Sequence, residues 1–264
     1  MSAVSVEILK KVYTNVSDQP GVIALEGIRL EIKEGEFTCI VGPSGCGKTT
    51  LLNLIGGLDK EFEGVISVNG VSPGQGSAIG YMFQSPRLMP WLNVEENVGL
   101  VLGREPDKDK KIKELLSEME LERFIYAYPK SLSGGMRRRT ALARAFITQP
   151  DFLLLDEPFL SLDVPVANRL RNMLLDLCKR HSATAIFVTH DLREAVYLGD
   201  RVLFMSGSPG RIVLDLLVDL PRPRIPEGPE VESFRLSLLK EHPDLLAGLV
   251  EEAGGVVKPQ ISGV

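Results

Sequence analysis

The chain has 264 residues, of which 44% are hydrophobic and 25% are charged, a composition typical of a globular protein with a substantial core. Its formal net charge of -5 argues against a protein that binds nucleic acid by neutralising phosphates. The three cysteines, Cys39, Cys46 and Cys178, are widely spaced, so they predict neither a disulfide framework nor a zinc site and fit a reducing cytosol.

No stretch reaches about 18 uninterrupted apolar residues, so the sequence predicts no membrane span. Residues 1–10 lack the basic start and the apolar run of a secretory signal. We therefore expect a cytoplasmic protein that reaches a membrane only through a partner.

The first part of the chain is expected to form strands around one helix. Alternating or short apolar runs predict strands over residues 4–8, 28–32, 37–41 and 65–68. A helix is expected from Thr49 to Leu58, weakened by the glycines near its end. Asn69-Gly70 predicts a tight turn that makes the fourth strand part of a hairpin.

Prolines and then helical periodicity mark the stretch from about residue 85 to 150. Helices are expected over residues 109–121 and 133–147, the second entered through two glycines. We interpret this stretch as a helical insertion between two strand-bearing halves. Further core helices of the main domain are the alternative, and periodicity does not separate the two.

Apolar runs and an amphipathic segment alternate in the last part of the chain. Strands are expected over residues 152–155, 185–188, 202–205 and 212–220, and a helix over residues 166–177. This alternation predicts a parallel sheet covered by helices on both faces. Residues 221–226 predict a proline-rich linker, residues 234–252 a terminal helix pair, and residues 254–264 a frayed end.

Residues 42–49 match the phosphate-binding loop pattern G-x-x-x-x-G-K-[ST] at every fixed position, between an expected strand and an expected helix. Its glycines let consecutive amides face an anion, Lys48 adds a cation for the β- and γ-phosphates, and the Thr49 hydroxyl is a ligand for Mg²⁺. An ordinary glycine-rich turn is the alternative. The candidate nucleotide-binding residues here are Gly42, Pro43, Ser44, Gly45, Cys46, Gly47, Lys48, Thr49 and Thr50.

Two carboxylates, Asp156 and Glu157, follow directly on the apolar run at residues 152–155. Ligands of parallel sheets bind at the carboxyl ends of the strands, so we expect Asp156 to hold Mg²⁺ there. Glu157 is then the candidate base, or the group that orients the water attacking the γ-phosphate. An acid pair at a helix N-terminus is the alternative, which the upstream phosphate loop disfavours.

A second glycine-rich anion site is expected at Ser133, Gly134 and Gly135, where a helix begins. One chain cannot easily place two such cradles on a single γ-phosphate, whereas two chains in a head-to-tail C2 dimer can. The sequence therefore predicts two composite sites in a homodimer. A merely well-capped helix is the alternative.

Together these motifs resemble the ATPase subunits of ATP-binding-cassette transporters over roughly the first 220 residues. The resemblance implies an α/β fold with a P-loop NTPase core and a mostly parallel sheet, an N-terminal antiparallel β subdomain and a helical insertion subdomain. Residues 1–220 would form the nucleotide-binding domain, with the helical subdomain at about 85–150, and residues 221–264 a proline-rich linker and helical tail. The implied cofactors are ATP and Mg²⁺.

The same resemblance implies roles for four further residues. Tyr13 resembles the aromatic residue that stacks on adenine, and Gln84 the glutamine that senses Mg²⁺ and the attacking water. Asp163 lies in a segment that resembles the loop crossing the dimer to the other site, and His190 resembles the switch histidine that contacts the γ-phosphate. A surface aromatic and a structural histidine are the alternatives for Tyr13 and His190.

The chain departs from the family pattern just after the second glycine-rich site. Met136 stands where many relatives carry glutamine, and it cannot hydrogen bond as an amide does. Residues 137–139 are three arginines, more basic than the usual mixture with a central glutamine. We interpret these arginines as a solvated helix face.

A narrower resemblance, to the nitrate, sulfonate and taurine group of bacterial importers, rests on residues 86–94, 205–212 and 219–224. Within the first of these segments, Trp91 is expected either to line a groove that receives a coupling helix of a permease or to pack against the core of its own subdomain.

The expected function is ATP hydrolysis at a head-to-tail dimer interface that drives import of a small solute. The implied partners are a second copy of the chain, integral membrane permease subunits and, indirectly, an external solute-binding protein, with the ATPase on the inner face of the membrane. Two alternatives remain open: a soluble cassette ATPase serving an assembly or repair complex, and a non-hydrolytic, nucleotide-gated binding module. The sequence does not name the solute.

Overall fold

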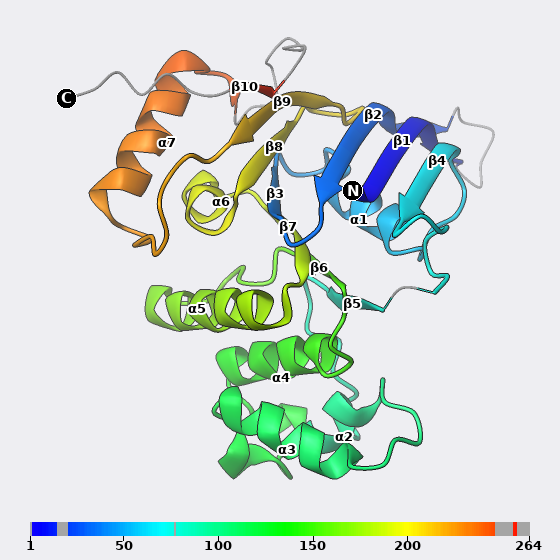
Figure 1. The fold of residues 1–264 in the computed structure, drawn as a ribbon, viewed down its shortest axis with the longest axis vertical. Coiled ribbons are helices and arrows are strands. Elements are labelled where there is room, and N and C mark those ends of the chain that lie inside the picture. Colours follow the sequence, from blue (N-terminus) through cyan, green and yellow to red (C-terminus); the bar gives the residue numbers. More distant parts are fainter. Residues whose placement is uncertain (1, 15–20, 77, 246–255, 258–264) are drawn as a thin grey trace. The chain divides into compact units, whose positions relative to one another are not determined.

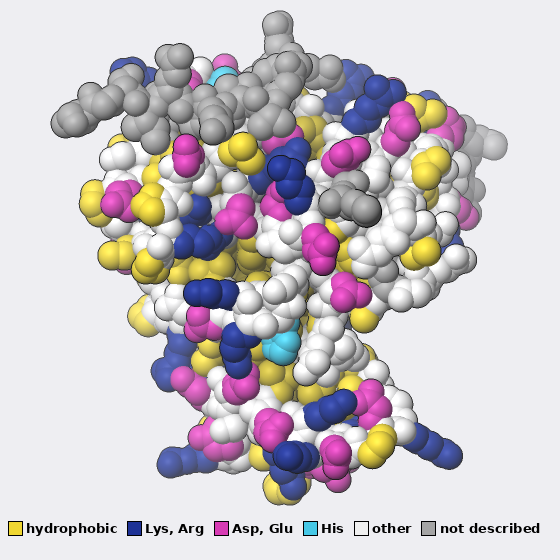
Figure 2. Space-filling model, in the orientation of Figure 1, with side chains coloured by type: hydrophobic (Ala, Val, Ile, Leu, Met, Phe, Trp, Pro, Cys, Tyr) yellow, Lys and Arg dark blue, Asp and Glu magenta, His cyan; other side chains and the backbone are white. Residues whose placement is uncertain are grey.

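The computed structural model describes residues 2–14, 21–76, 78–245 and 256–257, drawn as a ribbon in Figure 1 and as a space-filling view in Figure 2. The chain divides into two compact units, which we describe separately. The first unit contains Met1–Gly76 and Ala185–Val264, and the second contains Ser77–Thr184.

The first unit begins with a three-stranded antiparallel sheet in the order β2-β1-β4. Its strands are β1 (Ser2–Tyr13), β2 (Val22–Lys33) and β4 (Glu63–Val68). Val6 on the central strand pairs with Leu30 on one side and Ile66 on the other, and all three are buried. The predicted antiparallel N-terminal sheet is therefore confirmed, with longer strands than the apolar alternation marked.

The tight turn at Asn69-Gly70 is present, because Val68 and Val71 exchange two backbone hydrogen bonds of 2.8 and 3.1 Å across it. The expected hairpin is limited to this one antiparallel bridge between Val68 and Val71, since in the described residues the strand that pairs along β4 is β1. A short turn motif fixes only its own geometry, whereas strand pairing depends on which apolar face is available elsewhere in the chain.

The second sheet of the first unit has the order β10-β9-β8-β3-β7. Its strands are β3 (Phe37–Val41), β7 (Thr184–Thr189), β8 (Arg201–Met205), β9 (Ile212–Leu217) and β10 (Val256–Val257). The fully buried strand β3 runs parallel to both of its neighbours, β7 and β8, while β9 is antiparallel to β8. This mixed, mostly parallel sheet confirms the predicted α/β class.

The helices of the first unit are α1 (Lys48–Ile55), α6 (Leu192–Leu198) and α7 (Pro229–Glu241). Helix α1 ends at Ile55 with Gly56 as its C-cap, earlier than expected. The periodicity did not reveal α6, because seven residues span only two turns. The first predicted tail helix is present as α7 and begins at a proline. The second tail helix and most of the predicted frayed end lie outside the described residues.

The second unit is mainly helical. Its elements are β5 (Ile79–Met82), α2 (Val94–Gly99), α3 (Lys108–Glu118), two short 3-10 turns (Glu122–Phe124 and Pro129–Ser131), α4 (Gly134–Phe146), β6 (Phe152–Asp156) and α5 (Val164–His181). The strands β5 and β6 are parallel partners. No sequence pattern predicts β5, because this strand is only four residues long and contains Gly80. A Cβ on Gly80 would lie 2.3 Å from the Ala145 carbonyl oxygen, so glycine is required by close packing.

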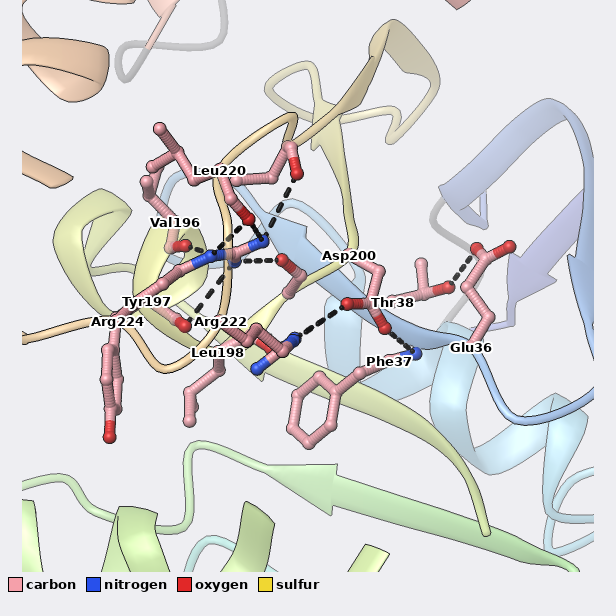
Figure 3. Close-up of polar contacts among 12 residues, drawn as sticks. Glu36, Phe37, Thr38, Val196, Tyr197, Leu198, Asp200, Leu220, Arg222 and Arg224 are labelled. Atoms are coloured by element: carbon pink, nitrogen blue, oxygen red, sulfur yellow. Dashed lines mark hydrogen bonds and ion pairs between the residues drawn. The ribbon is translucent and has the colours of Figure 1, made fainter. Parts of the chain in front are cut away.

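Residues 221–226 form neither helix nor strand, as expected. Two arginines of this linker, Arg222 and Arg224, donate hydrogen bonds to carbonyl oxygens at the end of α6 (Figure 3). Arg224 is only 8% exposed and donates to the carbonyl oxygens of Val196, Gly199, Val218 and Leu220. Arg222 donates to Leu198 O at 2.6 Å and to Asp200 Oδ1 at 2.7 Å. These cations satisfy carbonyls that have no partner inside the helix.

The contacts of these two arginines also extend to β3, the central strand of the sheet. Asp200, which pairs with Arg222, accepts a 3.0 Å hydrogen bond from the backbone amide of Phe37 at the start of β3 (Figure 3). Burial, followed by the charge of Arg222, lowers the pKa of Arg224 to about 10. Arg224 therefore remains protonated near neutral pH and keeps its donors.

We expect Arg224→Met to lower the free energy of unfolding by about 3 kcal/mol, because the change leaves buried carbonyls without donors. Arg222→Met is the matched control two residues away. Its ion pair with Asp200 is solvent-exposed, so its loss should cost about 1 kcal/mol. Urea denaturation followed by circular dichroism measures the free energy of unfolding of both variants. Equal losses would contradict the conclusion that the buried hydrogen bonds of Arg224 are the main stabilising contacts of the linker.

Candidate functional site

The phosphate-binding loop lies between the end of β3 and the start of α1, the context that the motif requires. Gly45 and Gly47 have φ angles of 80° and 99°, in the region that favours glycine. A Cβ on Gly47 would also lie 2.7 Å from Leu25 Cδ2 and 2.9 Å from the Ala24 carbonyl oxygen. Both the backbone conformation and the packing therefore require glycine at position 47.

Lys48 is buried along the inside of this loop. Its Nζ donates to the carbonyl oxygens of Gly42 at 2.8 Å and Pro43 at 2.9 Å. The Cys46 side chain is also buried, and burial raises the pKa of its thiol. Cys46 therefore has only its backbone to offer a ligand. The outer face of the loop, which includes Ser44, Gly45 and Thr49, is exposed.

His190 follows strand β7 at the same edge of the sheet at which the phosphate-binding loop follows β3. The parallel strands β3 and β7 pair so that Val41 and Thr189 are partners, and Gly42 and His190 are the next residues on each strand. His190 is exposed, while Thr189 is buried. The position predicted for a switch histidine is thus beside the phosphate-binding loop in the sheet of the first unit.

Hydrogen bonds fix the backbone on both sides of His190. The Thr189 hydroxyl donates to the buried Glu194 carboxylate at 2.6 Å and accepts from the Asp191 amide at 3.1 Å. Asp191 caps α6 by accepting from the amides of Arg193 and Glu194. Thr189 and Glu194 were not predicted. These two residues position His190 through a buried hydrogen bond between a hydroxyl and a carboxylate, and no sequence motif identifies such a pair.

Tyr13 is the last residue of β1, and a lysine ammonium group lies over its ring. The buried Lys11 Nζ lies 4.6 Å from the ring centroid and pairs with Asp59 at 2.8 Å. The phenol oxygen lies 3.3 Å from both Asp59 Oδ2 and Thr50 Oγ1, next to the phosphate-binding loop. The residue is 42% exposed, which is compatible with stacking of its ring on a planar base.

In the second unit, Gln84 and Glu157 lie at the end of the parallel pair β5–β6. Met82 and Leu155 are strand partners, so the residues that follow them leave the sheet together. Gln84 Nε2 lies 3.5 Å from Glu157 Oε2. Glu157 has a φ of 42°, an uncommon conformation for a residue with a side chain, which is often held at functional sites.

Asp156 is the last residue of β6 and is buried. Burial, and then the charge of Asp156, raise the pKa of the neighbouring Tyr81 phenol. Glu157, by contrast, is partly exposed. Of the two adjacent acids, one is thus fixed inside and the other faces the solvent, which fits a metal ligand beside a group that acts on water.

Ser133 caps α4, since its Oγ accepts a 3.2 Å hydrogen bond from the Met136 amide. Ser133 and Gly134 are exposed, whereas Gly135 is buried. A Cβ on Gly135 would lie 2.7 Å from Val166 Cγ1 on α5, so this glycine also serves packing. Asp163 likewise caps α5 by accepting from the Val166 amide at 3.0 Å.

The expectation that residues 137–139 form a solvated helix face was wrong for Arg138. Arg137 is exposed, but Arg138 is buried and donates to the carbonyl oxygens of Gln84 and Leu160. Arg139 is partly buried and pairs with Glu120 at 2.8 Å. Successive residues of an α-helix point about 100° apart, so three adjacent arginines cannot share one face. This periodicity was the signal that could have identified Arg138.

The exposure of Trp91 excludes the alternative that this residue packs in the core of its own subdomain, because Trp91 is 70% exposed. Met89, close by, is held by Asn97, which is fully buried and exchanges hydrogen bonds with its backbone. The tryptophan therefore projects from an anchored segment.

The donor chemistry fits Mg²⁺. Thr49, Gln84 and Asp156 offer hydroxyl, amide and carboxylate oxygens, which are the hard ligands that this ion prefers. Across the described residues there is no cluster of three or more histidine, cysteine or acidic side chains that could hold a metal ion. Mg²⁺ commonly binds through one or two carboxylates together with substrate phosphates and water. None of the helices in the described ranges is long and apolar enough to cross a bilayer.

Comparison with known proteins gives a consistent picture. Residues 25–160 match the family model described as "ABC transporter". The chain is 44% identical over 216 residues to the "Aliphatic sulfonates import ATP-binding protein SsuB 2" of Burkholderia cenocepacia, which covers 81% of this chain and 80% of that protein. It is 41% identical over 241 residues to the protein named SsuB of Bacillus subtilis, covering 90% and 94%.

Among solved structures, the chain is similar to the ATP-binding cassette MJ0796 in a dimeric post-hydrolysis state bound to ADP and Pi. The TM-score is 0.74 at 32% identity, and the match covers 83% of this chain and all of that one. These similarities agree with the geometry of the structure. The phosphate-binding loop lies beside a histidine on one sheet edge, and a buried acid ends β6, as the motifs of this family require. The chain belongs to the ABC transporter family, as an ATP-binding cassette ATPase coupled to transport.

Proposed function

We propose that this protein hydrolyses MgATP in a head-to-tail homodimer and thereby powers import of an aliphatic sulfonate or a related small solute through a membrane permease. The observation that carries the catalytic part is the pairing of Gln84 with the partly exposed Glu157, 3.5 Å apart at the end of two parallel strands. The solute class is supported by relatives that are named as sulfonate import proteins.

The phosphate-binding loop holds the triphosphate through its amides and the Lys48 ammonium, and Tyr13 stacks on the adenine. Thr49, Asp156 and Gln84 are the proposed Mg²⁺ ligands, directly or through water. The bound ion would neutralise charge on the β- and γ-phosphates.

Glu157 accepts the proton of the attacking water or orients it, and His190 contacts the γ-phosphate. The fixed backbone around His190 supports its role, because a group that acts in the transition state gains from being positioned beforehand. An intact Glu157 and His190 disfavour the non-hydrolytic alternative.

The second copy supplies Ser133, Gly134 and Gly135 to the nucleotide held by the first copy, and Asp163 contributes to the same contact across the dimer. The exposed, capped start of α4 supports this proposal, since Ser133 and Gly134 are accessible on the monomer. The dimeric structures of the similar cassette support the stoichiometry.

The permease is the proposed membrane partner, which places the ATPase on the cytoplasmic face of the membrane, with an external solute-binding protein acting indirectly. Trp91 is a candidate contact with the permease, because an exposed aromatic on an anchored segment is typical of interaction hot spots. The names of the relatives favour import over the soluble assembly alternative.

Glu157→Gln should retain ATP binding and lower kcat at least about a hundredfold, because the amide cannot take up the proton of the attacking water. An ATP-bound dimer should accumulate. Steady-state phosphate release and size-exclusion chromatography with ATP measure the two effects. The exposed Glu122→Gln is the control, and normal turnover by Glu157→Gln would remove this residue from the catalytic role.

Two inactive variants should complement each other if the sites are composite. Ser133→Arg impairs the cradle and Lys48→Ala the phosphate-binding loop, so each mixed dimer keeps one intact site. We expect ATPase activity from the mixture that exceeds that of either variant alone. Differently tagged copies allow heterodimers to be verified, and an inactive mixture in which heterodimers are present would contradict the head-to-tail arrangement.

Tyr13→Ala should weaken ATP binding about tenfold, the loss of one base–aromatic stack, whereas Tyr13→Phe should retain most of the affinity. Binding of inorganic tripolyphosphate, which has no base, should be the same in all three proteins. Calorimetric titration measures these affinities, with the exposed Tyr126→Ala as control. A parallel loss of tripolyphosphate affinity would show that Tyr13 acts otherwise than by stacking.

A further inference from the structure

Arg138 is a buried cation whose donors go to two separate loops. It lies on the second turn of α4, only 9% exposed, and its Nη1 donates to the Gln84 carbonyl oxygen. Its Nη2 donates to the Leu160 carbonyl oxygen at 3.1 Å. Burial lowers the pKa of this guanidinium, but it has ample margin to stay charged at neutral pH.

These bonds close a ring that includes the proposed catalytic pair. The Gln84 side chain reaches Glu157, and the Glu157 carbonyl oxygen accepts a 3.2 Å hydrogen bond from the Leu160 amide. The Leu160 carbonyl then leads back to Arg138. The guanidinium therefore ties the backbone of Gln84 to the turn that begins at Glu157.

The turn that Arg138 holds is conformationally unusual. Glu157 and Ser161 both have positive φ angles, 42° and 63°, although neither is glycine. Such conformations persist when surrounding contacts determine them, and the fork of a guanidinium can fix two carbonyls at once. Leu160 lies between these two residues, so the bond from Arg138 acts at the centre of the unusual segment.

Helix α4 holds the glutamine segment at a second point. Arg144, about two turns further along, donates to the carbonyl oxygens of Pro86 at 2.8 Å and Arg87 at 2.9 Å. The Gln84 segment is thus fastened to α4 at both ends, and of these two arginines it is Arg138 that also reaches the turn after Glu157. The distinct contribution of Arg138 is to couple these two loops.

We propose that Arg138 is a positioning residue for ATP hydrolysis, which sets the placement of Gln84 relative to Glu157 by holding the backbone of both loops. The inference rests on the proposed function of that pair. A neutral amide side chain at position 138 would be shorter and would lack the planar fork, so it would hold the two carbonyls less firmly.

The test compares Arg138→Met with Arg137→Met in the full-length chain. Arg137 precedes it on the same helix, is exposed and serves as the matched control. We expect Arg138→Met to lower kcat at least about tenfold with a nearly unchanged KM for ATP, because small displacements of catalytic groups slow chemistry strongly. Arg137→Met should hydrolyse ATP like the unmodified chain. Equal kcat values for the two variants would overturn the proposal.

A rescue series separates positioning from general destabilisation. Arg138→Lys keeps the charge but serves one carbonyl at a time, and Arg138→Gln keeps an amide donor, so both should give kcat values between those of the unmodified chain and Arg138→Met. If kcat instead follows the melting temperature through the series while KM rises in step, Arg138 is only structural and the proposal fails. Arg138→Lys also serves as the test if the methionine variant does not fold.

A double-mutant cycle with Gln84→Ala completes the design, since alanine keeps the carbonyl that Arg138 binds but removes the side chain that meets Glu157. Arg138→Met should lower kcat markedly less in this background than alone. The same fold-loss in both backgrounds would overturn the proposal. Full activity of Glu157→Gln would instead indicate failure of the proposed function, whatever the Arg138 variants do.

Discussion

Parallel strand pairing in register is the constraint on which the placement of the candidate functional residues depends. In the first unit, the pairing of Val41 with Thr189 brings the phosphate-binding loop and His190 to one edge of the sheet. In the second, the pairing of Met82 with Leu155 does the same for the loops that carry Gln84 and Glu157. A slip of one residue in either pair would turn buried strand residues to the opposite face and displace these loops, so core burial and site geometry are fixed by the same contacts.

Buried cations that bind main-chain carbonyls recur where loops must be held. Lys48 binds carbonyls of its own loop, Arg138 binds those of Gln84 and Leu160, and Arg224 binds the last carbonyls of α6. A buried charge is tolerated only when its hydrogen bonds are satisfied, and a carbonyl without a partner is costly as well. Each cation thus fixes the chain around it, which explains why segments without regular structure have defined conformations in this protein.

Membership of the ABC transporter family accounts for the motifs, while the contacts of Met136 and Arg138 show what these two residues do in this chain. Met136 gives its amide to the cap at Ser133, so the helix start is preserved without the usual glutamine side chain. Arg138 is a charged fork that donates to backbone carbonyls rather than to another side chain. A run of positive charge in the sequence therefore does not predict whether Arg137, Arg138 or Arg139 is exposed, because the helix turns successive side chains to different directions.

The sequence by itself determined the phosphate-loop motif, the acid pair at the end of β6, the capped start of α4 and the α/β class, because each depends on residues that are contiguous or regularly spaced. Only the tertiary structure decided the pairing of β4 with β1, the existence of β5 and the contacts of Arg138, Thr189 and Arg224. These depend on segments that are distant in the chain, or on elements too short to leave a periodic pattern. Local chemistry thus identifies the groups that can act, whereas long-range packing determines how firmly they are held.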